Sequence, residues 1–214
     1  MLEEATRLTL IRHGETTWNR AARIQGHTDI PLSELGLAQA ERLAEALADE
    51  PFAAIYASDL SRARQTAEAV ARSRGLAIQF DTDLRERAFG RFEGLSWEQI
   101  NEQFPEDAAR WRRREPDFPV GGGEALTPFS ARCLAAARRA VAAHVGESIA
   151  LVAHGGVLDC LYRAATGVAL DAPRSWQLGN ATINRLLATA DGFTLIGWND
   201  DHHLAGLSAD DVSA

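Results

Sequence analysis

Four basic residues lie just after the ends of apolar runs in the sequence. An arginine fork matches the oxygens of a phosphate group, and an imidazole can act as a nucleophile or a base near neutral pH. The four residues are Arg12 and His13 after the run 8–11, Arg62 shortly after the run 52–57, and His154 after the run 149–153. Glycine directly after each histidine lets the backbone come close to a ligand. These types and positions favour chemistry on a phosphate ester.

The elements that must position these side chains alternate along the chain. Strands are expected over 8–11, 52–57, 77–80 and 149–153, and helices over 35–47, 58–73, 97–104, 129–145 and from 154 onward. Two antiparallel strands, 183–188 and 193–198, are joined by a turn at Asp191-Gly192. This pattern predicts an α/β fold, a three-layer α/β/α sandwich with a mainly parallel sheet and an antiparallel edge strand. Since parallel strands end at one edge, the basic side chains are expected to converge there.

The amino-acid composition indicates which classes of partner are excluded and which cellular compartment is expected. The chain has 214 residues and a formal net charge of −8, which argues against nucleic acid as a partner. All 22 basic residues are arginines, so a phosphate-loop lysine and a Schiff-base lysine are excluded. No apolar run is long enough to span a membrane, and the first residues do not have the pattern of a secretory signal. Two isolated cysteines, Cys133 and Cys160, suit a reducing compartment, and we expect a cytoplasmic protein.

A single domain is expected over residues 1–207, followed by an acidic tail over 208–214. The stretch 110–124 is rich in proline, glycine and arginine, which predicts a loop within a lid-like insertion at about 95–126. Within it, Arg112, Arg113 and Arg114 either contact the substrate or remain in solvent as surface charges. The sequence leaves both possibilities open.

A leaving alkoxide needs a proton, and Glu86 is the candidate donor. It follows the strand expected over 77–80, so it can reach the same edge of the sheet. A bound phosphate dianion would favour the protonated carboxyl group. The alternative is a surface carboxylate paired with Arg85 or Arg87, and spacing alone does not separate the two.

Further blocks around these residues resemble the histidine phosphatase superfamily, the group built around cofactor-dependent phosphoglycerate mutase. The resemblance covers about residues 8–204. The blocks that carry it are, in order, Arg12-His13-Gly14-Glu15-Thr16, Trp18-Asn19, Gln25-Gly26, the run 29–33, the run 58–67, Leu84-Arg85-Glu86, Phe89-Gly90, Glu93-Gly94, Gly122-Gly123-Glu124 and His154-Gly155-Gly156. So many matched blocks in one order make the resemblance specific.

The resemblance implies a role for each matched residue. His13 would be the nucleophile that becomes phosphohistidine, and Glu86 the proton donor and then the base that activates water. The residues that would hold the phosphoryl group are Arg12, Arg62, His154 and Asn19, with Thr16, Gln25 and Gly155 lining the pocket. The resemblance also implies no cofactor and no metal, a small phosphorylated metabolite as partner, and either a monomer or a homodimer.

Within the family, the chain resembles phosphatases more than mutases. The mutases usually carry asparagine where this chain has Gly156, and they carry a lysine-bearing motif that cannot occur here. We therefore expect a metal-independent phosphatase that hydrolyses small phosphomonoesters, with a cofactor-dependent phosphoglycerate mutase as the alternative. Two other classes are a metallohydrolase that uses His13, His154 and His202, and a phosphate-ligand-binding module without catalysis.

The other residues that could do chemistry are interpreted as structural. They are His27 in a loop near the pocket entrance, His144 late in a helix, the segment Asp201-His202-His203, Asn180 and Thr182 before a strand, and Cys160 in the helix after His154.

Overall fold

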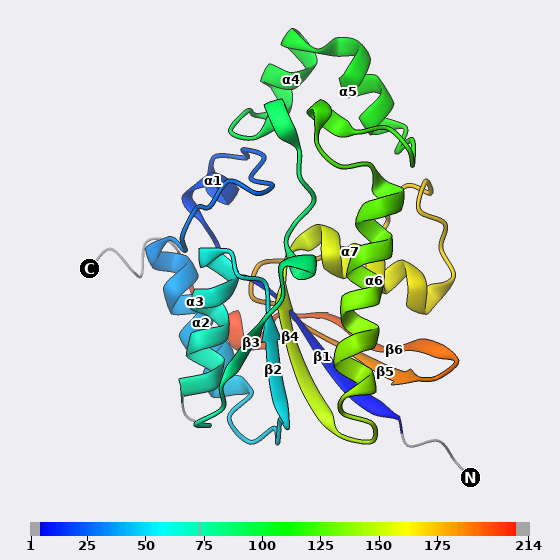
Figure 1. Cartoon of the computed structure of the whole chain (residues 1–214). Coiled ribbons are helices and arrows are strands. Elements are labelled where there is room, and N and C mark those ends of the chain that lie inside the picture. Colours follow the sequence, from blue (N-terminus) through cyan, green and yellow to red (C-terminus); the bar gives the residue numbers. More distant parts are fainter. Residues whose placement is uncertain (1–4, 73, 209–214) are drawn as a thin grey trace.

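The computed structural model describes residues 5–72 and 74–208, which form an α/β protein around one six-stranded sheet (Figure 1). The strands are β1 (Thr6–Arg12), β2 (Ala54–Ala57), β3 (Ile78–Phe80), β4 (Ser148–Ala153), β5 (Ile183–Thr189) and β6 (Gly192–Asp200), in the order β3-β2-β4-β1-β5-β6. The first four strands of that order pair in parallel, and β5 and β6 pair antiparallel. The predicted mainly parallel sheet is confirmed, and its antiparallel edge is a hairpin of two strands.

β1 and β4 lie side by side in the middle of the sheet and carry the two histidines to one edge. They pair with Arg12 opposite Ala153, and the apolar residues of both strands are buried. Continuous apolar runs of this kind suit strands that are covered on both faces. Because the His13 amide donates to the carbonyl oxygen of Ala153 at 3.0 Å, His13 and His154 leave the sheet at the same level.

Helices cover both faces of the sheet, which confirms the predicted three-layer sandwich (Figure 1). One layer contains α2 (Glu34–Ala46) and α3 (Ser61–Arg72), and the other contains α6 (Leu126–Ala142) and α7 (Gly155–Thr166). Each layer buries an apolar cluster against the sheet, with Leu43 and Val70 on one side and Phe129 and Leu161 on the other. α3 begins shortly after β2 and α7 begins directly after His154, and both helices are held in place by packing on the sheet.

Local signals explain where these helices begin and end. The Ser33 hydroxyl caps α2 by accepting from the Gly36 amide at 3.1 Å. The Asp29 carboxylate caps α3 from a distant loop by accepting from the Ser61 amide at 2.8 Å. α7 ends at Gly167, whose φ of 72° lies in the left-handed region that glycine adopts without strain. The predicted end of α3 near Ser73 lies outside the described residues.

A further group of helices lies beyond the carboxyl ends of the strands (Figure 1). α4 (Trp97–Gln103) and α5 (Pro105–Arg112) pack on an apolar cluster of their own that includes Phe92, Ile100 and Phe118. The other short helices are α1 (Thr17–Arg20), η1 (Thr82–Leu84), η2 (Gly90–Phe92), η3 (Val120–Gly122) and η4 (His202–Leu204). We call residues 95–123 the α4–α5 segment.

The prediction of a loop over 110–124 was wrong for its first three residues. Residues 110–112 form the last turn of α5. Pro105 at the first helical position and acidic residues in the first turn favour a helix here. The ring of Trp111 stacks on Phe92 with 5.8 Å between the ring centroids, so tertiary packing extends the helix to Arg112, the first of the three consecutive arginines.

Most of the predicted acidic tail, residues 209–214, lies outside the described residues. Within 5–72 and 74–208, none of the helices has the length and apolar character needed to cross a membrane.

Candidate active site

His13 and His154 lie against each other at the edge of the sheet, as their places after β1 and β4 predict. Their ring centroids are 5.1 Å apart, and the ring planes meet at 61°. Both side chains are buried, with 3% of His13 and 0% of His154 exposed. Burial lowers the pKa of both rings well below the usual value of 6.5, and the nearby charge of Arg62 lowers it further. Both rings are therefore neutral at neutral pH.

The hydrogen bond of His13 determines which of its nitrogens can react. Its Nδ1 lies 2.7 Å from the carbonyl oxygen of Gly14. A carbonyl oxygen only accepts, so Nδ1 carries the proton of the neutral ring and Nε2 keeps its lone pair. A Cβ on Gly14 would lie 2.5 Å from the carbonyl oxygen of Gly36, so glycine is required where this loop passes α2. The geometry thus leaves Nε2 of His13 with an unprotonated lone pair, which is able to attack an electrophile.

His154 and Arg62 orient each other. The Nε of Arg62 donates to Nδ1 of His154 at 3.2 Å, so Nε2 of the ring carries the proton and donates to the Ser58 hydroxyl at 2.8 Å. The two terminal nitrogens of Arg62 donate to the carbonyl oxygens of Gly26 and Thr28 at 2.7 and 3.0 Å. Arg62 is 1% exposed, and these contacts hold its guanidinium group in one orientation beside the two rings.

Arg12 provides the clearest sign of an anion site. One of its terminal nitrogens donates to the carbonyl oxygen of Leu178 at 2.6 Å, but its Nε is buried and has no hydrogen-bond partner among the described residues. Burial lowers the pKa of Arg12 to about 10, so the group is still charged at neutral pH. A Cβ on Gly155 would lie 3.6 Å from this Nε and 4.0 Å from Oε2 of Glu86. The absent side chain of Gly155 thus leaves space for an oxyanion between Arg12 and Glu86.

Glu86 lies in this cluster and is held by two backbone amides. Its Oε1 accepts from the Arg87 amide at 2.8 Å, and its Oε2 accepts from the Gly156 amide at the start of α7 at 3.0 Å. The alternative of a surface carboxylate paired with Arg85 or Arg87 side chains is not what the structure contains. The carboxyl group faces the same space as Arg12.

Three side chains from separate elements hold the segment that carries Glu86. Arg132 of α6 donates to the carbonyl oxygens of Asp83, Arg85 and Glu86 at 2.7, 2.8 and 2.9 Å. His27 also binds the Glu86 carbonyl oxygen through Nε2 at 2.8 Å. The carboxylate of Asp59, at the end of β2, accepts from Nε of Arg85 at 2.7 Å. Glu86 is therefore anchored to both helical layers.

The remaining predicted site residues lie in α1 or close to it in the sequence. Thr16 and Asn19 form a capping box in which the Oδ1 of Asn19 accepts from the Thr16 amide at 3.1 Å. Because Asn180 also donates to this Oδ1, at 3.3 Å, the NH2 group of Asn19 is available to a ligand. Gln25 is 9% exposed, and its Oε1 is buried with no hydrogen-bond partner within the described part of the chain.

Four residues near the site were missed by sequence analysis or interpreted as purely structural: Arg132, Asp159, Arg174 and Asn180. Asn180 donates to the carbonyl oxygens of His13 and Gly14 at 3.0 and 3.3 Å, so it supports the nucleophile loop. Asp159 and Arg163 form an oppositely charged i,i+4 pair in the otherwise uncharged α7, and such a pair is a signal that could have identified Asp159. Arg132 is one of three arginines of α6 and carries no such signal. Arg174 has no comparable signal in the sequence.

The three consecutive arginines have different surroundings. Arg112 donates to Asn101 at 2.6 Å and Arg113 to Glu115 at 2.7 Å, and both side chains are exposed. Arg114 turns the other way and donates to Asp159 of α7 at 3.2 Å. Of the two possibilities left open by the sequence, Arg112 and Arg113 are surface charges, and only Arg114 faces the site.

The other histidines lie away from the two central rings. His144 pairs with Glu147 at 2.7 Å, and His203 binds the Ala181 carbonyl oxygen at 3.0 Å. His202 pairs with Asp200 at 2.9 Å, and its side chain is 96% exposed. Across the described ranges 5–72 and 74–208, no three His, Cys, Asp or Glu side chains form a group that could hold a metal ion.

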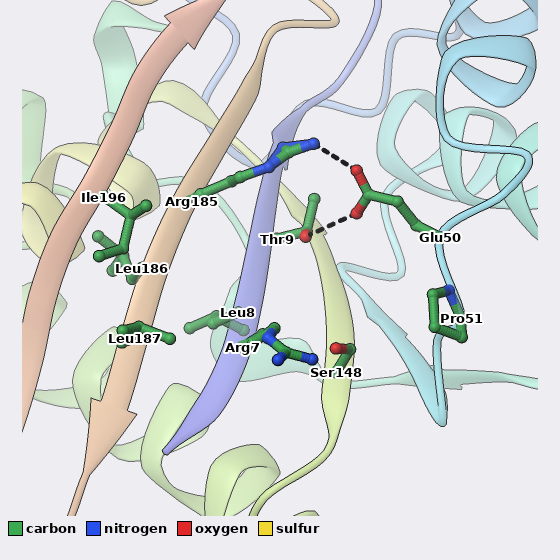
Figure 2. Close-up of a pocket in the computed structure, with 10 residues that line it drawn as sticks. All are labelled: Arg7, Leu8, Thr9, Glu50, Pro51, Ser148, Arg185, Leu186, Leu187 and Ile196. Carbon is green, nitrogen blue, oxygen red and sulfur yellow. Dashed lines mark hydrogen bonds and ion pairs between the residues drawn. The ribbon is translucent and has the colours of Figure 1, made fainter.

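A hollow of about 350 Å³ on the face of β1 and β5 is separate from this cluster (Figure 2). Figure 2 shows Glu50 bridging Thr9 and Arg185 across it, with Ile196 on the opposite wall. None of the predicted site residues lines this hollow.

An imidazole with an unprotonated Nε2, a second imidazole and the guanidinium groups of Arg12 and Arg62 lie together at the edge where the parallel strands end. This arrangement and the three-layer α/β/α fold define a phosphate-handling protein. Comparison with known proteins agrees with this class. Residues 8–201 match the family model described as histidine phosphatase superfamily (branch 1), and the chain belongs to this family. The resemblance stated from the sequence is thereby confirmed.

Relatives in this family carry names of both phosphatases and mutases. The chain is 39% identical over 202 residues to phosphoglycerate mutase-like protein 4 of Arabidopsis thaliana, with 92% of this chain and 86% of the relative covered. It is 36% identical over 207 residues to the metal-independent phosphoserine phosphatase of the same plant, with 95% and 85% covered. It also matches the structure of a mycobacterial glucosyl-3-phosphoglycerate phosphatase with a TM-score of 0.83 and 32% identity, over 92% of this chain and 100% of that chain.

Proposed function

We propose that this protein is a metal-independent phosphatase that hydrolyses small phosphomonoesters through a phosphohistidine intermediate on His13. The observation that carries the proposal is the unprotonated Nε2 of His13 in a cluster with the unpartnered Nε of Arg12. A neutral nucleophile and a cation with an unpartnered N–H group suit a phosphoryl group, which needs both attack and neutralisation of its charge. Two similar proteins named as phosphatases support the assignment.

The reaction would proceed in two displacements. In the first, the lone pair of Nε2 on His13 forms a bond to phosphorus, the ester P–O bond breaks, and the leaving alkoxide takes the proton of Glu86. The Gly14 carbonyl oxygen stabilises the positive charge that the ring gains, because it accepts from Nδ1. In the second, the Glu86 carboxylate takes a proton from water, whose oxygen attacks phosphorus while the P–N bond breaks. Inorganic phosphate leaves, and both side chains return to their starting states.

Arginines supply the positive charge in this mechanism. Arg12 and Arg62 would bind the phosphoryl oxygens, and the NH2 group of Asn19 would donate to the same group. His154 would position the guanidinium group of Arg62 through their hydrogen bond, and it would share in binding the phosphoryl group by turning its Nε2–H from the Ser58 hydroxyl to a phosphoryl oxygen. Gly155 provides the space for the oxyanion, and a half-turn of the Gln25 amide would place its NH2 group as a further donor.

Hydrolysis is proposed over mutase activity because of the contact between Gly156 and Glu86. A Cβ at position 156 would lie 2.1 Å from Oε1 of Glu86, so an asparagine there, as in the mutases, would require the carboxylate to move. In this chain the carboxylate lies over α7, near the anion space, where it can activate water. A phosphoglycerate mutase remains the second candidate, since phosphoglycerate mutase-like protein 4 is a relative.

The substrate would be a small phosphorylated metabolite, as for the relatives named for phosphoserine and glucosyl-3-phosphoglycerate. We further propose that residues 1–207 act as one catalytic domain in which residues 95–126 form a lid over the site. The two buried free cysteines, Cys133 and Cys160, are compatible with a cytoplasmic location.

Three measurements on purified protein test this function. Rapid quenching with a labelled phosphomonoester, followed by peptide mass spectrometry, should locate a phosphoryl group on His13. The His13→Ala variant should lose at least roughly a thousand-fold in kcat, whereas His202→Ala, at an exposed position, should keep the full rate. A chelator should leave the rate unchanged. Full activity of His13→Ala would overturn the mechanism, and loss of activity with the chelator would favour a metallohydrolase.

A further inference from the structure

A carboxylate with no part in the proposed reaction, that of Glu93, joins two segments of the site. Its Oε1 accepts from the amides of His27 and Phe89, both at 3.0 Å. Its Oε2 accepts from the amide and the hydroxyl of Thr28 at 2.9 and 2.6 Å. These four hydrogen bonds hold the loop 26–28 against the segment that leads into η2.

The loop 26–28 determines the orientation of Arg62. The guanidinium group of Arg62 donates to the carbonyl oxygens of Gly26 and Thr28 at 2.7 and 3.0 Å. The Gly26 carbonyl group and the His27 amide belong to one peptide group, and in a planar trans peptide the C=O and N–H point in opposite directions. The bond from the His27 amide to Glu93 therefore sets the direction of the oxygen that Arg62 binds.

The backbone at Gly26 is shaped to admit this carboxylate. Its φ is 56°, in the left-handed region that favours glycine. A Cβ at this position would lie 2.1 Å from Oε1 of Glu93, so a side chain here would displace the carboxylate from the peptide group that it holds. Glu93 thus occupies the space next to Gly26 that a side chain would fill.

The same carboxylate also acts on the segment that carries Glu86. The Nε2 of His27 donates to the Glu86 carbonyl oxygen at 2.8 Å. Glu93 binds the amide of that same His27 and also the amide of Phe89, three residues after Glu86. The position of the proton donor and the orientation of Arg62 therefore both depend on the bonds of one side chain.

The surroundings of Glu93 require an ionised carboxylate. Burial raises the pKa of Glu93, but the hydrogen bonds from the Thr28 hydroxyl and from three amides outweigh it and lower the pKa below the usual 4.5. A glutamine amide at this position would turn its NH2 group toward at least one backbone N–H in either orientation. Burial also lowers the pKa of Arg62, and the negative charge of Glu93 opposes that change.

We propose that Glu93 is a positioning residue that holds both Arg62 and Glu86 in place for phosphoryl transfer. It acts through the loop 26–28 and the backbone after Glu86, without touching the substrate. This inference rests on the proposed phosphatase function and adds a link between the group that binds the phosphoryl oxygens and the group that supplies the proton. Loss of Glu93 should weaken phosphate binding and proton donation together.

The isosteric variant Glu93→Gln tests the proposal through two separate measurements. The Kd of inorganic phosphate, from calorimetry, reports the orientation of Arg62. The ratio of kcat for an alkyl phosphate to kcat for an aryl phosphate reports proton donation by Glu86, because the aryl leaving group needs less protonation. We expect the Kd to rise on the order of ten-fold and the ratio to fall by about the same factor. The control Glu102→Gln, at an exposed position on α4, should change neither.

The other outcomes separate the proposal from a general loss of stability. A change in only one of the two quantities, or equal losses of kcat on both esters with an unchanged Kd, would overturn it. If thermal melting shows that Glu93→Gln does not fold, Thr28→Val, which removes one of the four donors, should still raise the Kd by about two- to five-fold, and an unchanged Kd would overturn the proposal. If wild type binds phosphate but hydrolyses neither ester, it is the proposed function that fails.

Discussion

Burial sets the chemical state of the two central imidazoles. A histidine in solution is half protonated near pH 6.5, but His13 and His154 lie in an environment that opposes a positive charge. Their hydrogen bonds then select the tautomers, with Nδ1 protonated in His13 and Nε2 protonated in His154. A nucleophile that is already neutral does not need a separate base to activate it.

The same lowered pKa values predict how stability depends on pH. Below pH 6.5 the unfolded chain binds protons at both rings, whereas the folded protein does not, so the free energy of unfolding should fall as the pH drops through 6.5 and be fully restored above it. Urea unfolding at pH 5.5 and 7.5 measures this difference. It should shrink in His154→Gln, which removes one of the two rings, and persist in His202→Gln. An equal pH dependence in wild type and His154→Gln would contradict the prediction.

A single methyl group at Gly156 should disturb the proton donor. In Gly156→Ala the new Cβ would meet Oε1 of Glu86 at 2.1 Å and Cζ of Phe129 at 3.0 Å, so the carboxylate must move. We expect kcat for an alkyl phosphate to fall by about 10²-fold or more, and kcat for an aryl phosphate, whose leaving group needs less protonation, to fall much less. The control Gly197→Ala adds a methyl group where no atom lies within 4 Å. Equal losses on both substrates would show that Glu86 is not the proton donor.

Among the elements, α6 has a role beyond covering the sheet. Its Arg132 donates to three carbonyl groups of the segment 83–86 and forms an ion pair with Glu124. One helix side chain therefore holds both the chain that leads into the α4–α5 segment and the chain that leads out of it. Only 19% of this side chain is exposed, and its bonds are therefore little screened by solvent.

Removing this clamp should reduce both stability and catalysis. Arg132→Met keeps much of the length of the side chain but leaves the carbonyl groups of Asp83 and Arg85 without a donor, and that of Glu86 with His27 alone. We expect a loss of about 2–4 kcal/mol in the free energy of unfolding, with a lower kcat as Glu86 loses its position. Urea unfolding and steady-state kinetics measure the two effects. Arg138→Met, an exposed change on the same helix, serves as the control. If Arg132→Met were as stable and active as Arg138→Met, the clamp would have no such role.

At the scale of the whole molecule, the α4–α5 segment is a second packing unit beside the three-layer sandwich. This segment has its own apolar cluster. Arg114, just after α5, connects it to α7 through Asp159 and to the loop after α7 through the carbonyl oxygen of Leu170. A unit with a separate small core can unfold locally at a lower free-energy cost than unfolding of the sheet requires.

Hydrogen–deuterium exchange should detect this separate opening. Amides of α4 and α5 should exchange faster than those of β1 and β4, and Arg114→Gln should accelerate exchange in α5 while leaving the central strands unchanged. The comparison is made peptide by peptide with Arg113→Gln as the reference. Simultaneous acceleration in the strands would mean that the segment and the sandwich unfold as one unit.

The sequence by itself determined the layered fold and the nearness of the two histidines. The runs 8–11 and 149–153 are apolar and long enough for buried strands, and each is followed by a histidine and then a glycine, which can be read locally from the sequence. Parallel pairing brings the carboxyl ends of two such strands to the same edge of the sheet, however their side chains pack. The same reasoning predicted that Arg62 and Glu86 reach that edge, although it could not separate Glu86 from a surface carboxylate.

Only the tertiary structure decided which charges face the site. Arg112, Arg113 and Arg114 are identical in type and adjacent in sequence, yet a positive φ at Arg114 and the buried Asp159 on a distant helix direct one of them inward. The tautomers of the imidazoles, the clamp of Arg132 and the helical turn over residues 110–112 likewise depend on contacts with segments elsewhere in the chain. Local sequence propensity does not identify such partners, because the contacts between them form only when the chain folds.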